Sequence, residues 1–207
     1  MDFAQWLSLL SICLLGAMSP GPSLAVVVNA SLRGGRSHGL VAGATHGIGV
    51  GLYGLLTVTG LAVLITRSPT VFLTLQLAGA AYLVYLGIKS LRSLGAGAAE
   101  SPDADGVSLG GSAMSGFLVA FLNPKLAIFM LALFSQFLRP EADTAEKALM
   151  ALTVGITDAS WYMLMGLLVS HPAVYRKLRE RAAMIDRVFG VLLILLALSV
   201  FYRALSA

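Results

Sequence analysis

The 207 residues are 57% hydrophobic and only 12% charged, whereas about a quarter of the residues in a soluble domain carry charge. The composition therefore excludes a soluble enzyme or binding domain and predicts an integral membrane protein. The net charge of +4 does not indicate nucleic acid as a partner. The Lys and Arg residues lie mainly at the ends of apolar segments, where they set membrane topology.

Six apolar stretches are long enough to cross a hydrocarbon core of about 30 Å, which takes about 20 helical residues. The first stretch lacks the basic leader of a signal peptide, so we expect it to be retained. We therefore predict an all-α integral membrane fold with six transmembrane helices. In chain order they are expected at 3–32, 38–66, 70–92, 113–138, 145–170 and 183–205.

Two of these helices, the first and the fourth, are interrupted by proline motifs. The first contains Ser19-Pro20-Gly21-Pro22 and the fourth contains Asn123-Pro124-Lys125. Each proline removes a backbone donor and clashes with the preceding helical turn. Irregular backbone at membrane depth persists only where it is buried in protein or lines a wet cavity. Both breaks therefore indicate a binding site.

The two breaks also indicate an internal repeat. The segment after the first break, Pro22–Val26, aligns with Pro124–Ile128, and Gly43–His46 aligns with Gly155–Asp158. Each half holds three helices, and an odd number forces the halves into opposite orientations, as in many transporters. We predict a first repeat at 1–92, a flexible linker at 93–112 and an inverted second repeat at 113–207.

The basic residues at the helix ends predict the orientation of the chain. One side of the membrane is expected to hold nine of them and the other side four. The richer side is placed in the cytoplasm by the positive-inside rule, so both termini are expected outside. The nine are Arg33, Arg36, Lys89, Arg92, Arg176, Lys177, Arg179, Arg181 and Arg187, and the four are Arg67, Arg139, Lys147 and Arg203.

Few ionisable residues are predicted at membrane depth, namely His46, Lys125 and Asp158. A Lys or Asp in that position costs roughly 2.5–3.5 kcal/mol on insertion scales, so such residues usually face a pathway. Asp186 and Arg187 are expected within about a turn of a helix end, where they reach water. The three deeper residues are therefore the candidates for chemistry.

Each candidate admits a structural interpretation as well as a functional one. Lys125 opens a half-helix, where it would bind a substrate carboxylate, pair with Asp158 or extend to water. Asp158 would hold a substrate ammonium, accept a coupling proton or form only an ion pair. His46 would relay protons or act as a hydrogen-bonded packing residue. Gly43, Gly47 and Gly51 are interpreted as a close-packing stripe.

Several segments together resemble the LysE/RhtB family of bacterial amino-acid exporters. They are the break at Ser19–Pro22, then Ser31–Arg36, Gly79–Gly87 and Phe121–Lys125. The resemblance covers nearly the whole chain, and the segments come in the family's order. It implies a multi-pass protein of the bacterial inner membrane that exports amino acids or close derivatives, driven by the proton gradient and without a cofactor. A homodimer is expected on family grounds only.

The substrate class stays open within that resemblance. A single intramembrane acid favours neutral, zwitterionic amino acids of the threonine and homoserine type, and basic amino acids are the alternative. A transporter of another small solute, such as a metal ion, is disfavoured because the three histidines are scattered and Cys13 is the only cysteine. No nucleophile–base pair stands out at helical spacing in the sequence, so we do not predict an enzyme. A non-transporting membrane subunit would leave the matched breaks unexplained.

Overall fold

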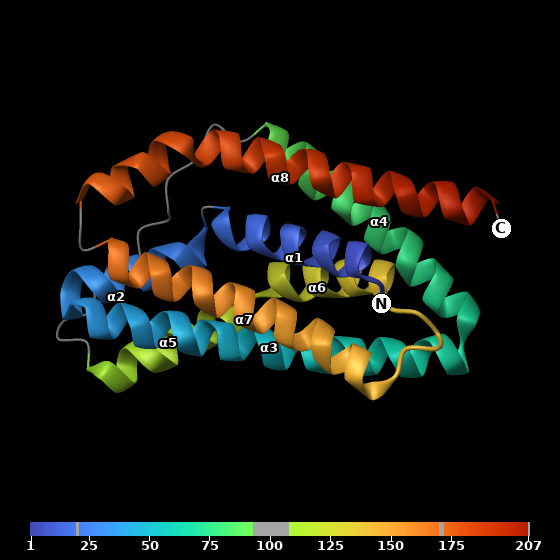
Figure 1. Cartoon of the computed structure of the whole chain (residues 1–207), viewed down its shortest axis with the longest axis horizontal. Coiled ribbons are helices and arrows are strands. Elements are labelled where there is room, and N and C mark those ends of the chain that lie inside the picture. The colour runs from blue at the N-terminus through green and yellow to red at the C-terminus, as the bar shows by residue number, and fades with distance from the viewer. Residues whose placement is uncertain (20, 93–107, 170–171, 207) are drawn as a thin grey trace.

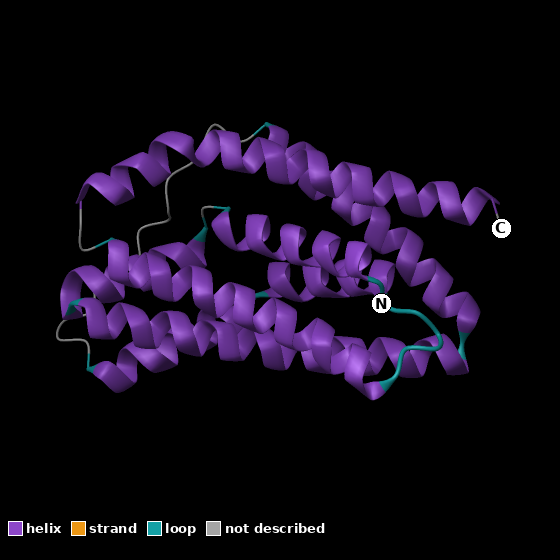
Figure 2. Cartoon of the chain, viewed as in Figure 1, coloured by secondary structure: helices purple, strands orange, loops and turns teal. Residues whose placement is uncertain are grey.

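The computed structural model describes residues 1–19, 21–92, 108–169 and 172–206. For Pro69, Pro124, Lys125, 172–179 and 203–206 it describes only the backbone. Every regular element in this part of the chain is a helix (Figure 2). The helices are α1 Phe3–Met18, α2 Pro22–Gly34, α3 Arg36–Arg67, α4 Pro69–Leu91, α5 Leu109–Phe121, α6 Pro124–Phe137, α7 Thr144–Leu168 and α8 Pro172–Ser206.

Four helices, α3, α4, α7 and α8, each hold a stretch that is long and apolar enough to cross a membrane. The remaining helices form two bent pairs. The pair α1 and α2 is bent by 59°, and the pair α5 and α6 by 56°. With each bent pair counted as one span, the described residues hold six candidate spans, and without them four. The predicted all-α membrane class is therefore confirmed.

Two helix starts differ from the sequence prediction. Helix α5 begins at Leu109, inside the predicted linker, because the Ser108 side chain accepts a hydrogen bond from the Gly111 amide and caps the helix. Helix α8 begins at Pro172, well before the predicted residue 183. The prediction followed only the apolar run, whereas the charged segment ahead of it is also helical.

Helix α3 is central to the bundle and packs along α7, with α2 and α5 on its flanks. The two helices run in opposite directions (Figure 1). Helix α4 packs against α8 and α6. Both termini, the turn between α3 and α4, and the connection from α6 to α7 lie at one end of the bundle (Figure 1).

Small residues allow α3 and α7 to approach closely. A Cβ atom added to Gly43 would lie 2.6 Å from the Met163 amide nitrogen, and one added to Gly155 would lie 3.0 Å from the Gly51 Cα atom. Real Cβ atoms essentially never show the first distance, and the second is tighter than nine in ten of their contacts. The predicted packing role of the glycine stripe is thus confirmed at Gly43.

Candidate functional site

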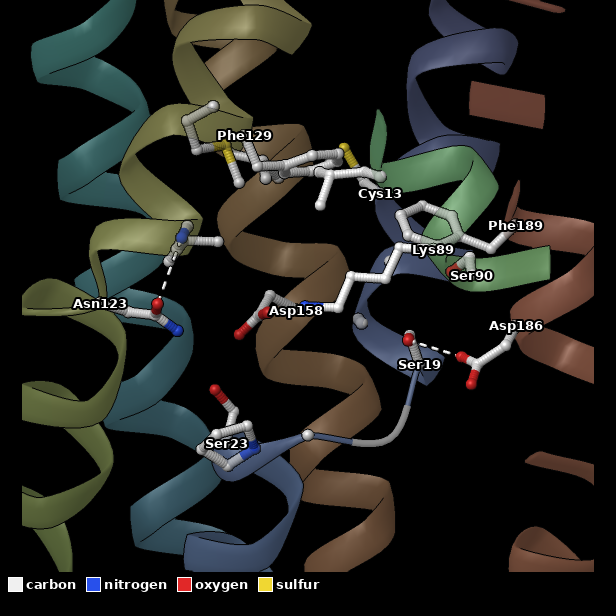
Figure 3. Close-up of a pocket in the computed structure, with 18 of the residues that line it drawn as sticks. Cys13, Ser19, Ser23, Lys89, Ser90, Asn123, Phe129, Asp158, Asp186 and Phe189 are labelled. Atoms are coloured by element: carbon white, nitrogen blue, oxygen red, sulfur yellow. Dashed lines mark hydrogen bonds between the residues drawn. The ribbon is translucent and has the colours of Figure 1, made fainter. Parts of the chain in front are cut away.

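A cavity of about 880 Å³ lies at the centre of the bundle and reaches both helix breaks (Figure 3). Small-molecule sites typically enclose about 300–1,000 Å³. The cavity is bounded by α1, α3, α4, α6, α7 and α8 together with the segments at the two breaks. Its polar lining includes Ser19, Ser23, His46, Lys89, Ser90, Arg92, Asn123, Asp158, Tyr162 and Asp186, and its apolar lining includes Cys13, Leu86, Phe129 and Phe189.

Most site residues predicted from the sequence meet at this cavity. Ser19, Gly21 and Pro22 line it from the first break, and Asn123 lines it from the second. His46 and Asp158 line it from α3 and α7. Of the other predicted residues, Pro20 lies outside the described residues. The side chains of Pro124 and Lys125 also lie outside the described part.

His46 and Asp158 form a buried pair. The Nδ1 atom of His46 lies 2.5 Å from the Oδ2 atom of Asp158, and the two residues are 2% and 8% exposed. The ring of Tyr162, one turn beyond Asp158, packs 4.5 Å from the imidazole between ring centroids. The partner of Asp158 in the described structure is therefore His46, and the predicted pairing with Lys125 stays untested.

The second ring nitrogen of His46, Nε2, is buried and has no hydrogen-bond partner among the described residues. A neutral imidazole that donates from Nδ1 carries a lone pair on Nε2. The pair can therefore hold a proton on the carboxylate, on the ring or between the two. Such an arrangement suits a group that takes up and releases protons.

At the first break, Ser19 joins α1 to α8. Its hydroxyl donates a 2.7 Å hydrogen bond to Oδ1 of Asp186. The expectation that Asp186 lies near a helix end and reaches water is wrong, since it lies well inside α8 and is only 5% exposed. The error came from starting the helix too late. The cavity therefore has two buried carboxylates in its wall.

The half-helices that follow the breaks begin differently. At the second break, the Asn123 side chain accepts a hydrogen bond from the Leu126 amide at 3.3 Å and so caps α6. At the first break, Gly21 precedes α2 and offers no side-chain cap. The first-turn amides of α2 thus have no side-chain cap and point their partial positive charge toward the cavity end of the helix.

Lys89 and Arg92 also line the cavity, a role that the sequence analysis missed. Both were assigned only to topology because they stand at the end of α4. A signal was present, however. Lys89 follows Leu86 by three residues, so the two share a helix face, and Leu86 is buried.

Comparison with known proteins identifies relatives over nearly the whole chain. Residues 14–204 match the model of a family described as LysE type translocator. A homoserine/homoserine lactone efflux protein of Salmonella typhimurium is 29% identical over 196 residues, which cover 94% of this chain and 95% of the relative. An uncharacterized membrane protein of Vibrio cholerae is 31% identical, over 77% of this chain and 76% of its own.

A third relative, the uncharacterized membrane protein YahN of Escherichia coli, is 27% identical over 91% of this chain and 85% of its own length. No solved structure matches the chain.

Proposed function

Because the chain belongs to the LysE type translocator family, and is thus a transporter rather than an enzyme, we propose that it exports neutral amino acids of the homoserine and threonine type. The efflux proteins among its relatives are named for homoserine and its lactone. Export is driven by protons moving inward through the same site. The protein acts in the bacterial inner membrane.

One observation carries this proposal: a ligand-sized cavity joins both helix breaks to a buried pair of titratable side chains. The volume of about 880 Å³ is ample for a single amino acid. The breaks supply backbone N–H and C=O groups that have no hydrogen-bond partner within a helix. His46 and Asp158 supply a site that binds either a proton or a cation.

An inverted repeat accounts for the position of this pair. The offset of 112 residues that aligns the halves relates Gly43 to Gly155 and also relates Gly51 to Met163. The close approach of Gly43 to Met163 therefore corresponds to the approach of Gly51 to Gly155, and both occur in the structure. If the two halves are related in this way, their two-fold axis passes between α3 and α7 close to His46. Transporters built from inverted repeats have their substrate sites at this interface.

In the proposed bound state the two charged ends of the amino acid occupy opposite parts of the cavity. The carboxylate accepts hydrogen bonds from the first-turn amides of the half-helix that starts at Pro22, and from those of the half-helix that starts at Pro124. Lys125 adds its positive charge at the second of these helix starts. The substrate ammonium binds the carboxylate of Asp158.

Substrate export is coupled to proton entry if Asp158 binds either the substrate ammonium or a proton, but not both. When the cavity faces outward, a proton reaches the pair and neutralises the carboxylate, which weakens its hold on the ammonium and releases the substrate. When the cavity faces inward, the proton leaves to the cytoplasm and a new substrate binds. His46 passes the proton through its ring, because one ring nitrogen contacts Asp158 and the other has no partner among the described residues.

The basic residues favour a cavity mouth on the cytoplasmic side. Lys89 and Arg92, both exposed, stand where α4 ends at the cavity, and they belong to the side richer in Lys and Arg. With that side in the cytoplasm, both termini lie outside. The described conformation is then open to the cytoplasm.

The test is export from whole cells whose cytoplasm is loaded with a panel of dipeptides. Cells that contain the protein should lose neutral amino acids faster than cells without it. Lys125→Ala and Asp158→Asn should each abolish the difference while the protein remains in the membrane. Proton-coupled export that survives Asp158→Asn would refute the coupling role. Unchanged efflux across the panel would instead indicate another solute, with a metal ion to be tried next.

Export of basic amino acids is the second candidate, and Asp186 favours it. A cationic side chain in the cavity needs a second anion besides Asp158, and the buried carboxylate of Asp186 faces the same space. Dipeptides that release lysine or arginine belong in the panel for this reason.

A further inference from the structure

We propose that Lys89 adds a further contact to the substrate carboxylate, beside the helix-start amides and Lys125, and thereby makes the site prefer amino acids to derivatives that lack a free carboxylate. This inference rests on the proposed export function. It concerns a residue of α4, outside the two breaks. Lys89 stands in the last turn of α4, and its side chain extends across the cavity toward Asp158 (Figure 3).

The charges in the cavity wall make Lys89 a candidate anion site. Asp158 is bonded to His46 at 2.5 Å, and Asp186 is bonded to Ser19 at 2.7 Å. Among the described residues Lys89 makes no hydrogen bond or ion pair, although it lines the same cavity. An ammonium group directed into a partly apolar cavity is best accommodated by an anion that enters with the substrate.

The position of Lys89 relative to Asp158 matches a zwitterion. One group is a cation carried by α4, the other an anion carried by α7, and the space between them is the cavity itself (Figure 3). An α-amino acid places its ammonium and its carboxylate on the same carbon, so it can satisfy both at once. A derivative without the carboxylate would satisfy only Asp158.

The long, flexible stem of the lysine is important for this role. A lysine ammonium acts as a compact point charge on four methylene groups, so it can follow the carboxylate as the cavity changes shape. Helix α4 packs on α8, where Gly87 and Gly190 meet, and a Cβ atom on Gly190 would lie 2.6 Å from the Gly87 carbonyl oxygen. A bound amino acid would therefore link the α4–α8 pair to the α3–α7 pair.

A simpler role for Lys89 is that of a cation at a helix end. The C-terminus of a helix attracts positive charge, and lysine side chains near a membrane surface commonly extend to lipid phosphates. In that case the side chain would contribute equally to every substrate. The two roles are separated by comparing substrates that differ only in the carboxylate.

The experiment measures efflux of homoserine and of homoserine lactone from proteoliposomes at slightly acidic pH, with the purified full-length protein. The lactone keeps the amino group and lacks the free carboxylate. Lys89→Met should reduce homoserine efflux about tenfold or more, the loss expected for one charge-assisted hydrogen bond. It should change lactone efflux by less than about threefold. Arg67→Ala, at the other end of the bundle, is the control for loss of a positive charge.

Lys89→Arg extends the test to a variant that keeps the charge, and it should retain most homoserine efflux. Equal losses for both substrates in Lys89→Met, or no loss for either, would overturn the carboxylate role. A wild-type protein that carries neither substrate would instead refute the proposed function, and the inference with it. Each variant is first checked for a single gel-filtration peak, and Lys89→Gln replaces Lys89→Met if the latter aggregates.

Discussion

The glycine-lined contact between α3 and α7 gives a prediction whose size follows from the geometry. In Gly43→Ala the new methyl group would lie 2.6 Å from the Met163 amide nitrogen and 2.7 Å from the Tyr162 carbonyl carbon. Ordinary van der Waals contact begins at 3.4 Å, so backbone atoms of α7 must move by several tenths of an ångström. Overpacking of this kind costs about 1–3 kcal/mol.

Two alanine substitutions on the same helix serve as matched controls. A Cβ atom on Gly51 would meet the Gly155 Cα atom at 3.5 Å, an ordinary contact, and one on Gly60 would meet nothing within 4 Å. Gly51→Ala should be close to neutral. Gly60→Ala should be neutral or more stable by up to about 1 kcal/mol, because alanine favours the helical state.

The assay is the temperature at which half of the detergent-solubilised protein loses its gel-filtration peak. For a chain of this size, 1 kcal/mol corresponds to a shift of about 2–4 °C, so Gly43→Ala should lower the midpoint by about 2–12 °C. A midpoint temperature for Gly43→Ala equal to that of Gly60→Ala would refute the reasoning. Helices α3 and α7 would then not pack in the close contact that places His46 beside Asp158.

Three further predictions concern the cavity and the topology. His46→Asn keeps a donor near Asp158 but removes the ring that passes the proton to it, so an inward proton gradient should accelerate efflux much less than in the wild type, measured as initial rates in proteoliposomes with and without the gradient. Ser19→Ala removes one hydrogen bond from a buried carboxylate and should lower stability by about 1–3 kcal/mol, with recovery in Ser19→Thr as the control. In a Cys13→Ser background, Glu141→Cys should react with an impermeant maleimide in intact cells. Ser37→Cys should react only after permeabilisation, and the reverse pattern would invert the proposed orientation.

The sequence was sufficient to predict the helical class and some of the residues around the cavity, those at the two breaks together with His46 and Asp158. Apolar runs of spanning length and matched proline motifs led directly to α1–α2 and α5–α6 as interrupted segments. The spacing of Gly43 and its neighbours predicted close packing. These features are local, because helix propensity, proline and glycine act within a few residues of their own position.

Contacts between helices were much less predictable. His46 and Asp158 were recognised as corresponding positions in the two halves, but their direct bond depends on how α3 is rotated against α7, which no local pattern specifies. Asp186 was misplaced because the start of α8 was taken from hydropathy, and the charged turns before it were not counted as helix. Lys89 was treated only as a topological charge, since its direction depends on the packing of α4 against α8.

The two ends of the bundle differ in a way that bears on transport. At the end that holds both termini, the Met1 ammonium lies 2.9 Å from Glu146, which also accepts a 2.9 Å hydrogen bond from Arg139. A little deeper, the Trp6 indole donates to the Thr153 hydroxyl at 3.0 Å. These contacts hold α1 against α7 beyond the cavity.

At the cavity mouth the chain offers instead the exposed side chains of Lys89 and Arg92. Under the proposed mechanism, release to the outside therefore requires the contact between α1 and α7 to separate while the seam between α3 and α7 stays closed. The composition of the two contacts agrees with this requirement. The seam is formed by backbone-to-backbone approach of glycines, which allows little movement. The polar links from the α1 end to α7 named above are one hydrogen bond, from Trp6 to Thr153, and the ion pair of Met1 with Glu146, and these can be exchanged for water. The rigid part of the molecule is thus the part that carries the His46–Asp158 pair, and the movable part is the half-helix that precedes the first break.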